Sequence, residues 1–324
     1  MKIIYLLLFA VFMSSCHQKP AQTAVSTIEL AAYPVFSPDS AYTFIEQQVA
    51  FGPRIPNTSA HKKCAEYLSG TLQRYGATVI LQNFQARAFN GDMLNGVNII
   101  GSYNPDAPKR VLLFAHWDTR PWSDHDPDPS NYSIPVLGAN DGASGVGVLL
   151  EVARQIGKSS PSIGVDIIFF DAEDYGAPES VASDDPHSWC LGSQYWGRNP
   201  HQPGYKASYG ILLDMVGAPG ATFYREQISE YFASDIVNKV WKAAHTLGFQ
   251  TYFRNEPGGS ITDDHLYVNR LAGIPSINII QYNPSGEKGF GDYWHTTNDT
   301  MENVDRSTLN AVGTTLLYIL YNER

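Results

Sequence analysis

The chain has 324 residues, of which 43% are hydrophobic, a composition typical of a globular protein with an apolar core. Its formal net charge is −10, from 22 basic and 32 acidic residues, and it contains no basic run. A nucleic acid is therefore not an expected partner, and the acidic balance mainly favours solubility.

The N-terminal segment MKIIYLLLFAVFMSSC differs in composition from the rest of the chain. It begins with Lys2, continues with an apolar run over 3–13 and ends with small residues before Cys16. The apolar run is too short to span a bilayer permanently, so it predicts a secretory signal. A cysteine directly after small residues is similar to a bacterial lipoprotein signal, in which Cys16 is lipidated and becomes the first mature residue. Cleavage near Cys16 without lipidation is the alternative.

This pattern predicts that the chain is divided into three parts. We expect a lipoprotein signal peptide over 1–16, a flexible polar tether over 17–35 and one folded domain over 36–324. The protein is then exported and periplasmic, and it contacts the inner or outer membrane only through its lipid anchor. We expect the domain to be a monomer.

Two further cysteines, Cys64 and Cys190, lie in the predicted domain. An exported protein can pair them in a disulfide. Two separate buried thiols are equally consistent with the sequence.

Helices and strands alternate along the predicted domain. Apolar residues have helical spacing over 41–52, 59–76, 142–157, 229–248, 263–273 and 307–323. Strands are predicted over 77–84, 98–103, 110–117, 165–170, 209–218 and 276–282. This order predicts an α/β fold, with a single domain and a mixed, mostly parallel central sheet covered by helices on both faces. The segments 118–140, 174–208 and 283–300 are predicted loops, and loops of this length are usually functional or disordered.

Acidic, histidine and tryptophan side chains gather at the edge where the predicted strands end. The residues are His116, Asp118, Asp141, Asp171, Glu173, Asp174, Asp214, Trp294 and His295. In an open α/β sheet, ligands bind beyond the carboxyl ends of the strands. The shared placement of these residues therefore predicts a site at that edge of the sheet.

The residue types at this edge suggest a metal. Several carboxylates packed together repel one another, and one must keep its proton unless a cation lies between them. Histidine nitrogen and carboxylate oxygen together suit zinc, which keeps an open position in catalytic sites. Glu173 and Asp174 are adjacent, so we expect one to bind the metal and the other to act as a general acid or base. We expect Asp171 to orient a ligand.

The order of these residues resembles the zinc aminopeptidase superfamily, whose members use two co-catalytic zinc ions. In that superfamily the ligand positions would be His116, Asp141, Asp174, Asp214 and His295. Asp141 would bridge the two ions, and Glu173 would be the base that activates water.

A branch of this superfamily matches further segments. FFDAED, LLDMVGA, TDDHLYVNRLAGIPSINII and YWHTTNDT resemble the glutaminyl-peptide cyclotransferases, or glutaminyl cyclases, of the animal-like type found in Bacteroidetes-type bacteria. The resemblance covers roughly residues 40–304. It implies a zinc aminopeptidase-like fold and the conversion of N-terminal glutamine of peptides and proteins to pyroglutamate with release of ammonia. It also implies one zinc per chain.

The resemblance assigns roles residue by residue. Asp141, Asp174 and His295 would hold the zinc, and Glu173 would shuttle the proton. Asp214 and Asp264 would hydrogen-bond around the reacting amine and Glu173, whereas one of Asp263 and Asp264 would cap the helix that follows. Trp294 would wall the pocket, and Trp189 would take the place of a pocket tryptophan of the animal enzymes. His116 and Asp118 would be a structural pair or ligands of a second metal.

Two other functions remain open. The first is a di-zinc aminopeptidase that hydrolyses N-terminal residues, for which His116 and Asp214 would both bind metal. The second is a non-catalytic binding module on the same scaffold, against which the complete set of Asp141, Glu173, Asp174 and His295 argues. The number of bound zinc ions, one or two, distinguishes the cyclase from the aminopeptidase.

Overall fold

A computed structural model describes residues 32–178, 181, 187–286 and 288–323. The predicted signal peptide, its Cys16 and most of the predicted tether lie outside the described residues. Among the described helices, none is both long enough and apolar enough to cross a membrane.

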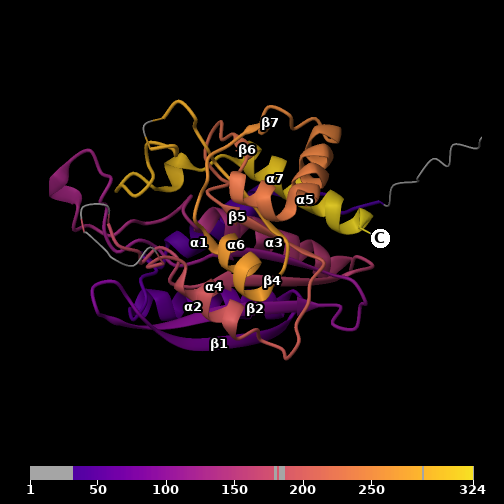
Figure 1. The fold of residues 1–324 in the computed structure, drawn as a ribbon, viewed down its shortest axis with the longest axis horizontal. Helices are drawn as coiled ribbons and strands as arrows, with labels where there is room; N and C mark the ends of the chain where they lie inside the picture. The colour runs from indigo at the N-terminus through magenta and orange to yellow at the C-terminus, as the bar shows by residue number, and fades with distance from the viewer. Residues whose placement is uncertain (1–31, 179–180, 182–186, 287, 324) are drawn as a thin grey trace, which may run out of the picture. The chain divides into compact units, whose positions relative to one another are not determined.

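A six-stranded sheet organises the described domain, in the order β1–β2–β4–β3–β5–β8 (Figure 1). The strands are β1 (Thr78–Arg87), β2 (Met93–Tyr103), β3 (Arg110–His116), β4 (Gly164–Phe170), β5 (Tyr209–Asp214) and β8 (Ser276–Ile280). β2 pairs antiparallel with β1 and β4, whereas β4, β3, β5 and β8 run parallel. The prediction of a mixed, mostly parallel sheet is confirmed.

Helices cover both faces of this sheet, as predicted. They are α1 (Pro38–Val49), α2 (Ser59–Arg74), α3 (Ala143–Lys158), α4 (Leu191–Arg198), α5 (Gln227–Thr246), α6 (Asp264–Tyr267) and α7 (Arg306–Asn322). Residues of α1, α2, α3, α5 and α7 share the large hydrophobic cluster on one face. On the other face, α4 and the π-helical turn Val268–Ala272 after α6 pack on the sheet through Trp196 and Val268.

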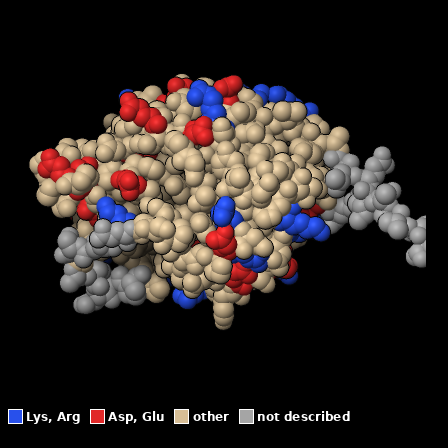
Figure 2. Space-filling view, turned by 90° about the horizontal axis from the view of Figure 1, so that it is seen from above, with Lys and Arg blue, Asp and Glu red and all other residues tan. Residues whose placement is uncertain are grey.

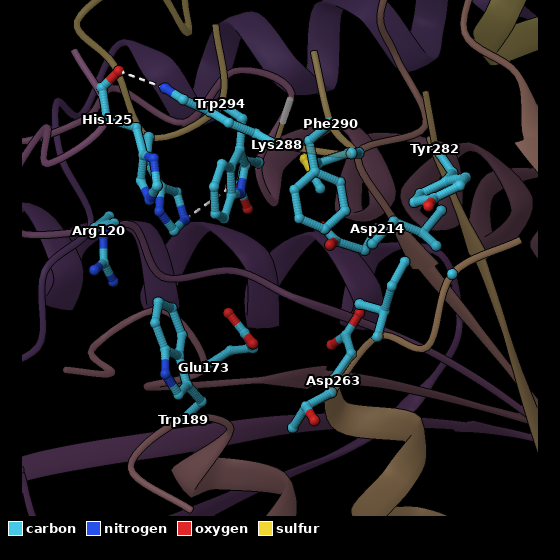
Figure 3. A pocket seen from close by; sticks show the side chains of 18 of the residues that line it. Arg120, His125, Glu173, Trp189, Asp214, Asp263, Tyr282, Lys288, Phe290 and Trp294 are labelled. Atoms are coloured by element: carbon cyan, nitrogen blue, oxygen red, sulfur yellow. Dashed lines mark hydrogen bonds and ion pairs between the residues drawn. The ribbon is translucent and has the colours of Figure 1, made fainter. Parts of the chain in front are cut away.

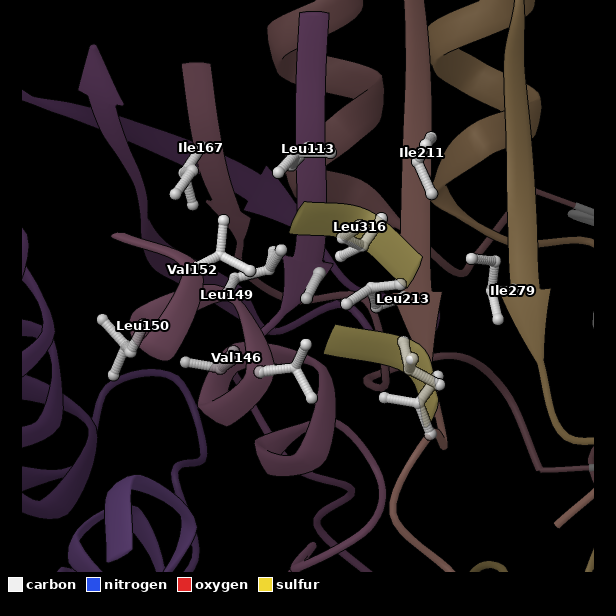
Figure 4. Packing of buried hydrophobic residues seen from close by; sticks show 14 of the residues in the cluster. Leu113, Val146, Leu149, Leu150, Val152, Ile167, Ile211, Leu213, Ile279 and Leu316 are labelled. Carbon is white, nitrogen blue, oxygen red and sulfur yellow. The ribbon is translucent and has the colours of Figure 1, made fainter. Parts of the chain in front are cut away.

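The parallel strands are apolar on both faces because both faces are buried. Alternate residues point to opposite sides, so Leu113 and Leu213 pack on α3, whereas Leu112 and Phe114 face α4. Figure 4 shows Val146, Leu149 and Val152 of α3 facing the strands, with Leu316 of α7 beside them. Burial of each side chain of this size stabilises the folded state by about 1.5–3 kcal/mol. The strands that end at the site are therefore held in place by a well-packed core.

Four elements differ from the sequence prediction. The strand predicted over 209–218 ends at Asp214, because the chain turns at Met215, which has a positive φ of 48°. Helix α4 lies inside the predicted loop 174–208, since its two glycines and polar residues weaken the helical pattern. A second, two-stranded sheet of β6 (Phe223–Arg225) and β7 (Phe253–Pro257) was not predicted because both strands are short.

Charged side chains of both signs are interspersed on the face shown in Figure 2. Cys64 and Cys190 are both free, buried thiols. Of the two arrangements that the sequence allowed, the structure has the separate thiols.

Candidate active site

A cavity of about 650 Å³ opens where β3, β4, β5 and β8 end (Figure 3). Its lining includes six of the residues that the sequence singled out, namely Asp141, Glu173, Trp189, Asp214, Trp294 and His295. These side chains come from five separate segments of the chain, so the sheet edge brings them together. Asp174, His116, Asp118 and Asp264 are buried and are not part of the lining.

Asp141, Asp174 and His295 form a compact group whose ligand atoms lie within 4.8 Å of one another. Nε2 of His295 is 3.2 Å from Oδ1 of Asp174 and 3.6 Å from Oδ2 of Asp141. Asp141 precedes α3, Asp174 follows β4, and His295 lies in the segment before α7, with a positive φ of 54°. The three residues therefore converge from three different connections.

This group fits a metal ion. Neither carboxylate oxygen of Asp174 has a hydrogen-bond partner among the described residues, although the side chain is buried. Burial and the nearby Asp141 carboxylate raise the pKa of Asp174 well above its usual value, which a cation would reverse. Burial and Arg120 hold the pKa of His295 well below its usual value, so its imidazole is neutral and able to ligate. Two carboxylates and one imidazole are suitable zinc ligands.

His116 lies beside this group and contacts two carboxylates. Its Nε2 is 2.9 Å from Asp141 and 3.2 Å from Asp214. Burial opposes the protonation of His116, but hydrogen bonds to Asp118, Asp141 and Asp214 raise its pKa well above the usual value. A side chain on Gly142 would meet this imidazole at 2.5 Å, so only glycine allows the close approach. His116, Asp141 and Asp214 also lie within 4.8 Å of one another, as a second set of ligand atoms.

Asp118 contacts the turn after β4, whereas His116 contacts the carboxylates of Asp141 and Asp214. The two carboxylate oxygens of Asp118 accept hydrogen bonds from the backbone N–H groups of Glu173 and Asp174, each at 3.1 Å. Both oxygens are therefore engaged in holding the turn after β4. Of the two roles that the sequence left open for Asp118, this geometry favours the structural one.

Asp171, at the start of the same turn, contacts β2 and α2. Its buried carboxylate accepts from the N–H of Val97 at 2.6 Å and contacts Nε2 of His61 at 2.8 Å. It also accepts from the N–H of Ala172 at 2.8 Å. Asp118 and Asp171 together immobilise the segment that carries Glu173 and Asp174.

Glu173 borders the cavity and has two close neighbours of its own. Glu173, Cys190 and Asp263 place ligand atoms within 4.8 Å of one another. Burial, together with the carboxylates of Asp263, Asp174 and Asp264, raises the pKa of Glu173 well above its usual value. A half-buried carboxylate with a raised pKa, open to a cavity, is suited to accept and return a proton.

Asp263 and Asp264 have separate environments. Asp263 caps α6 by accepting from the N–H of Asp264, lines the cavity and accepts from Nδ2 of Asn278 at 2.7 Å. Asp264 is fully buried, and the structure places it outside the cavity lining. The sequence-based choice of Asp264 for the site stays a prediction, whereas the geometry puts Asp263 next to Glu173.

Aromatic rings form the wall of the cavity. Trp294 stacks on His295 with ring centroids 3.8 Å apart, and Trp189 stacks parallel to His295 at 5.9 Å. Arg120 lies 4.5 Å from the centre of the Trp189 ring and pairs with Asp124 at 2.6 Å. Trp189 and Trp294 thus lie on the wall that the resemblance implied for them.

Sequence reasoning missed four residues that build the site. They are Arg120, Cys190, Asp263 as a neighbour of Glu173, and Asp299, whose carboxylate accepts from the N–H groups of Asn140 and Asp141 at 2.7 and 3.0 Å. Asp263 and Asp299 stood in quoted motifs, TDDHLYVNRLAGIPSINII and YWHTTNDT. Arg120 and Cys190 act through contacts between distant segments, for which the sequence carries no local signal.

Comparisons with known proteins agree with this geometry. A model of peptidase family M28 matches residues 98–320. The chain is 28% identical over 250 residues to the glutaminyl-peptide cyclotransferase of Bos taurus, which covers 67% of this chain and 63% of the length of the bovine protein.

Two solved structures are more similar. A glutaminyl cyclase of Tannerella forsythia is 57% identical, with a TM-score of 0.88, and the match covers 90% of this chain and 100% of that one. A Zn-dependent exopeptidase of Parabacteroides distasonis is 58% identical, with a TM-score of 0.89 and the same coverage of both chains.

The predicted resemblance to glutaminyl cyclases within the zinc aminopeptidase superfamily is confirmed by these matches. They also support zinc as the metal that the acidic site would hold. The family match spans more than two thirds of the sequence and includes every proposed zinc ligand. The chain belongs to peptidase family M28.

Proposed function

We propose that this chain is a zinc-dependent glutaminyl-peptide cyclotransferase, which converts the N-terminal glutamine of peptides and proteins to pyroglutamate and releases ammonia. The observation that carries this proposal is the 57% identity to a glutaminyl cyclase over 90% of the chain. The cavity supports it, because acidic and aromatic groups converge on a space that is open to a peptide end.

In this proposal Asp141, Asp174 and His295 hold one zinc ion per chain. A zinc ion there would supply Lewis-acid polarisation of the γ-carboxamide of the substrate. The Asp174 oxygens, which accept no hydrogen bond from the described residues, and the neutral imidazole of His295 are the features that suit these residues to the role.

Glu173 moves the proton. The α-amine of the substrate attacks its own γ-carboxamide carbon, so a C–N bond forms within one residue and the bond to the amide nitrogen breaks. Glu173 accepts the proton that the amine loses and delivers it to the departing nitrogen, which leaves as ammonia. The remaining task is to hold the amine and the carboxamide carbon in contact, which accounts for the rigid aromatic wall of Trp189 and Trp294.

Asp214 and Asp263 border the cavity near Glu173 and supply acceptors for the substrate amine. Asp264 lies behind Asp263 and raises the pKa of Glu173 through its charge. His116 bridges Asp141 and Asp214 through Nε2, and in the one-zinc proposal it stays a structural partner of both carboxylates.

The mass of the product tests the function. The purified chain is incubated with a peptide that begins with glutamine, and the product is analysed by mass spectrometry. Loss of one ammonia, with every residue retained, is the expected result. Loss of the whole first residue would contradict the proposal.

A di-zinc aminopeptidase is the second candidate. His116, Asp141 and Asp214 form a second set of ligand atoms within 4.8 Å, and a similar structure is a Zn-dependent exopeptidase. Metal analysis of the purified chain separates the two candidates, because the cyclase proposal expects one zinc and the aminopeptidase expects two.

The location of the protein is also a proposal. The composition of residues 1–16 supports export and lipidation at Cys16, which would place a monomeric enzyme in the periplasm, anchored to the inner or outer membrane. Cys16→Ala should move the protein from the membrane fraction to the soluble periplasmic fraction. Unchanged fractionation would contradict the lipid anchor, and size-exclusion chromatography tests the monomer.

A further inference from the structure

The thiol of Cys190 lies directly against Glu173. Its Sγ is 3.1 Å from Oε1 of Glu173, and its backbone N–H donates to the backbone carbonyl of Glu173 at 2.9 Å. Cys190 is fully buried, immediately before α4. Two separate groups of one residue therefore contact both the backbone and the side chain of Glu173.

The Glu173 carboxylate has no other hydrogen-bond donor in the described part of the chain. Its close neighbour Asp263 is itself an acid, already occupied with Asn278 and the N–H of Asp264. Glu173 also borders the cavity, so part of its side chain faces open space. The thiol is thus the group that can determine which way the carboxylate points.

The thiol is a donor in this setting. Burial, followed by the charges of Glu173 and Asp264, raises the pKa of Cys190 well above its usual value, so the sulfur keeps its proton. A thiol is a weak donor and withdraws little charge from the oxygen that accepts from it. It can orient the carboxylate and leave its ability to accept a proton largely intact.

The backbone of Cys190 is unusual as well. Its φ is 59°, in the left-handed region that a residue with a side chain adopts only at an energetic cost. Conformations of this kind persist where the surrounding structure holds them, often next to functional groups. Here the conformation accompanies the two contacts with Glu173.

We propose that Cys190 is a positioning residue for the proton-transferring Glu173. Its S–H group donates to Oε1 and holds the carboxylate so that the second oxygen faces the substrate. This inference rests on the proposed function, in which Glu173 moves the proton.

Two substitutions separate positioning from structural support. Cys190→Ala removes the donor, whereas Cys190→Ser retains one, and both keep the same constraint on a residue with positive φ. Cys64→Ala is the matched control, because Cys64 is also a free, fully buried thiol but lies on α2, away from the cavity. All three variants are made in the full chain.

We expect Cys190→Ala to lower kcat about tenfold and to leave KM within about twofold, since the substrate still binds but the base is misoriented. Cys190→Ser should recover kcat to within about threefold of the unaltered chain. Cys64→Ala should lower the melting temperature without changing kcat. Zinc content should be equal in all four proteins.

Three results would overturn the inference: a kcat of Cys190→Ala within twofold of the unaltered chain, a Cys190→Ser variant no faster than Cys190→Ala, or a loss of zinc from both variants. A failure of the proposed function is distinguishable, because the unaltered chain would then release no ammonia. If it removes the first residue instead, the same comparison of variants is made on that reaction, in which Glu173 is again the base.

An infrared measurement tests the contact without any activity. The S–H stretching band of Cys190 is the band that disappears in Cys190→Ala. In Glu173→Ala this band should move toward the frequency of a thiol with no acceptor, while the Cys64 band stays in place. An unmoved Cys190 band would show that the thiol does not donate to Glu173 and would end the proposal.

Discussion

Glu226 and Asp174 are both buried acids, but their surroundings are opposite. The Glu226 carboxylate caps α5 by accepting from the N–H groups of Ile228 and Ser229 at 2.8 and 2.6 Å. It also accepts from the N–H of Ile261 and contacts Nε2 of His265 at 3.1 Å. Burial alone would raise its pKa, but the hydrogen bonds from His265, Ser229 and Ile228 lower the pKa to about 2.

Asp174 has no such hydrogen bonds among the described residues, and the guanidinium of Arg120 lies 3.5 Å from its Oδ1. Its two oxygens lack hydrogen-bond partners in the described structure, and the Asp141 carboxylate nearby raises its pKa further. Hydrogen bonds satisfy the Glu226 carboxylate, which stabilises the fold, whereas the Asp174 carboxylate, a candidate metal ligand, has none from the described residues. For this pair of residues, hydrogen-bond satisfaction distinguishes the structural acid from the candidate ligand, whereas burial does not.

Asp174→Asn removes the unsatisfied carboxylate of the candidate site and tests whether it is a metal ligand. The variant should bind no zinc and lose about 10³-fold or more in activity, equivalent to several kcal/mol of transition-state stabilisation. In the metal-free chain at pH 8 it should raise the melting temperature by about 2 °C, because a repelled buried charge is removed. Metal analysis, turnover and thermal unfolding measure the three effects.

Glu226→Ala is the control for this experiment, since it removes a buried acid but should keep the zinc. A variant of Asp174 that retained its zinc and its activity would remove this residue from the ligand set. A lowered melting temperature of metal-free Asp174→Asn would show that the carboxylate also supports the fold.

Glu173→Gln should keep the zinc and lower turnover by about 10²–10⁴-fold, because the amide cannot accept the proton of the amine. Steady-state kinetics and metal analysis measure both. Glu151→Gln is a matched control. Glu151 is a buried glutamate on α3 that contacts Ser37 and Arg154 and does not line the cavity, so this variant should keep the activity of the unaltered chain. Full turnover of Glu173→Gln would refute the base assignment.

Glu226→Ala should destabilise the fold by about 2–4 kcal/mol, because it leaves His265 and several buried N–H groups without an acceptor. Urea unfolding measures this loss, and turnover per folded molecule should fall less than about twofold. A larger loss of turnover with little change in stability would place Glu226 in the site.

The contribution of Glu226 should also depend on pH with a definite sign. Its pKa is depressed from 4.5 to about 2 in the folded chain, so the stabilisation is complete above pH 4.5 and is lost as the pH falls toward 2. The shift corresponds to about 3 kcal/mol. Unfolding free energies of the unaltered chain and Glu226→Ala should therefore converge by up to this amount over that range. A constant difference between them would exclude this linkage.

Much of the fold could be predicted because it depends on local pattern. The six strands of the main sheet and the long helices have clear apolar periodicity, and the acids that follow β3, β4 and β5 could be assigned to one edge from strand order alone. The weakly patterned elements, α4, β6 and β7, could not, because tertiary packing rather than propensity stabilises them.

The candidate site was predictable in its members but not in its contacts. Asp263 and Asp264 are neighbours in one motif, yet the backbone at the start of α6 sends the first to the cavity and the second into the interior. Asp118 shows the same limit: it stood at a strand end like a ligand, but its oxygens accept from the turn that carries Glu173 and Asp174.

The sequence by itself determined the fold class, the family and the edge of the sheet at which the acids gather, because periodicity and motif order are properties of short segments. Only the tertiary structure decided which acids are satisfied, which are not, and that Cys190 contacts Glu173. Those outcomes depend on side chains meeting across segments distant in the chain, such as Asp141 and His295, and no local pattern encodes such a meeting.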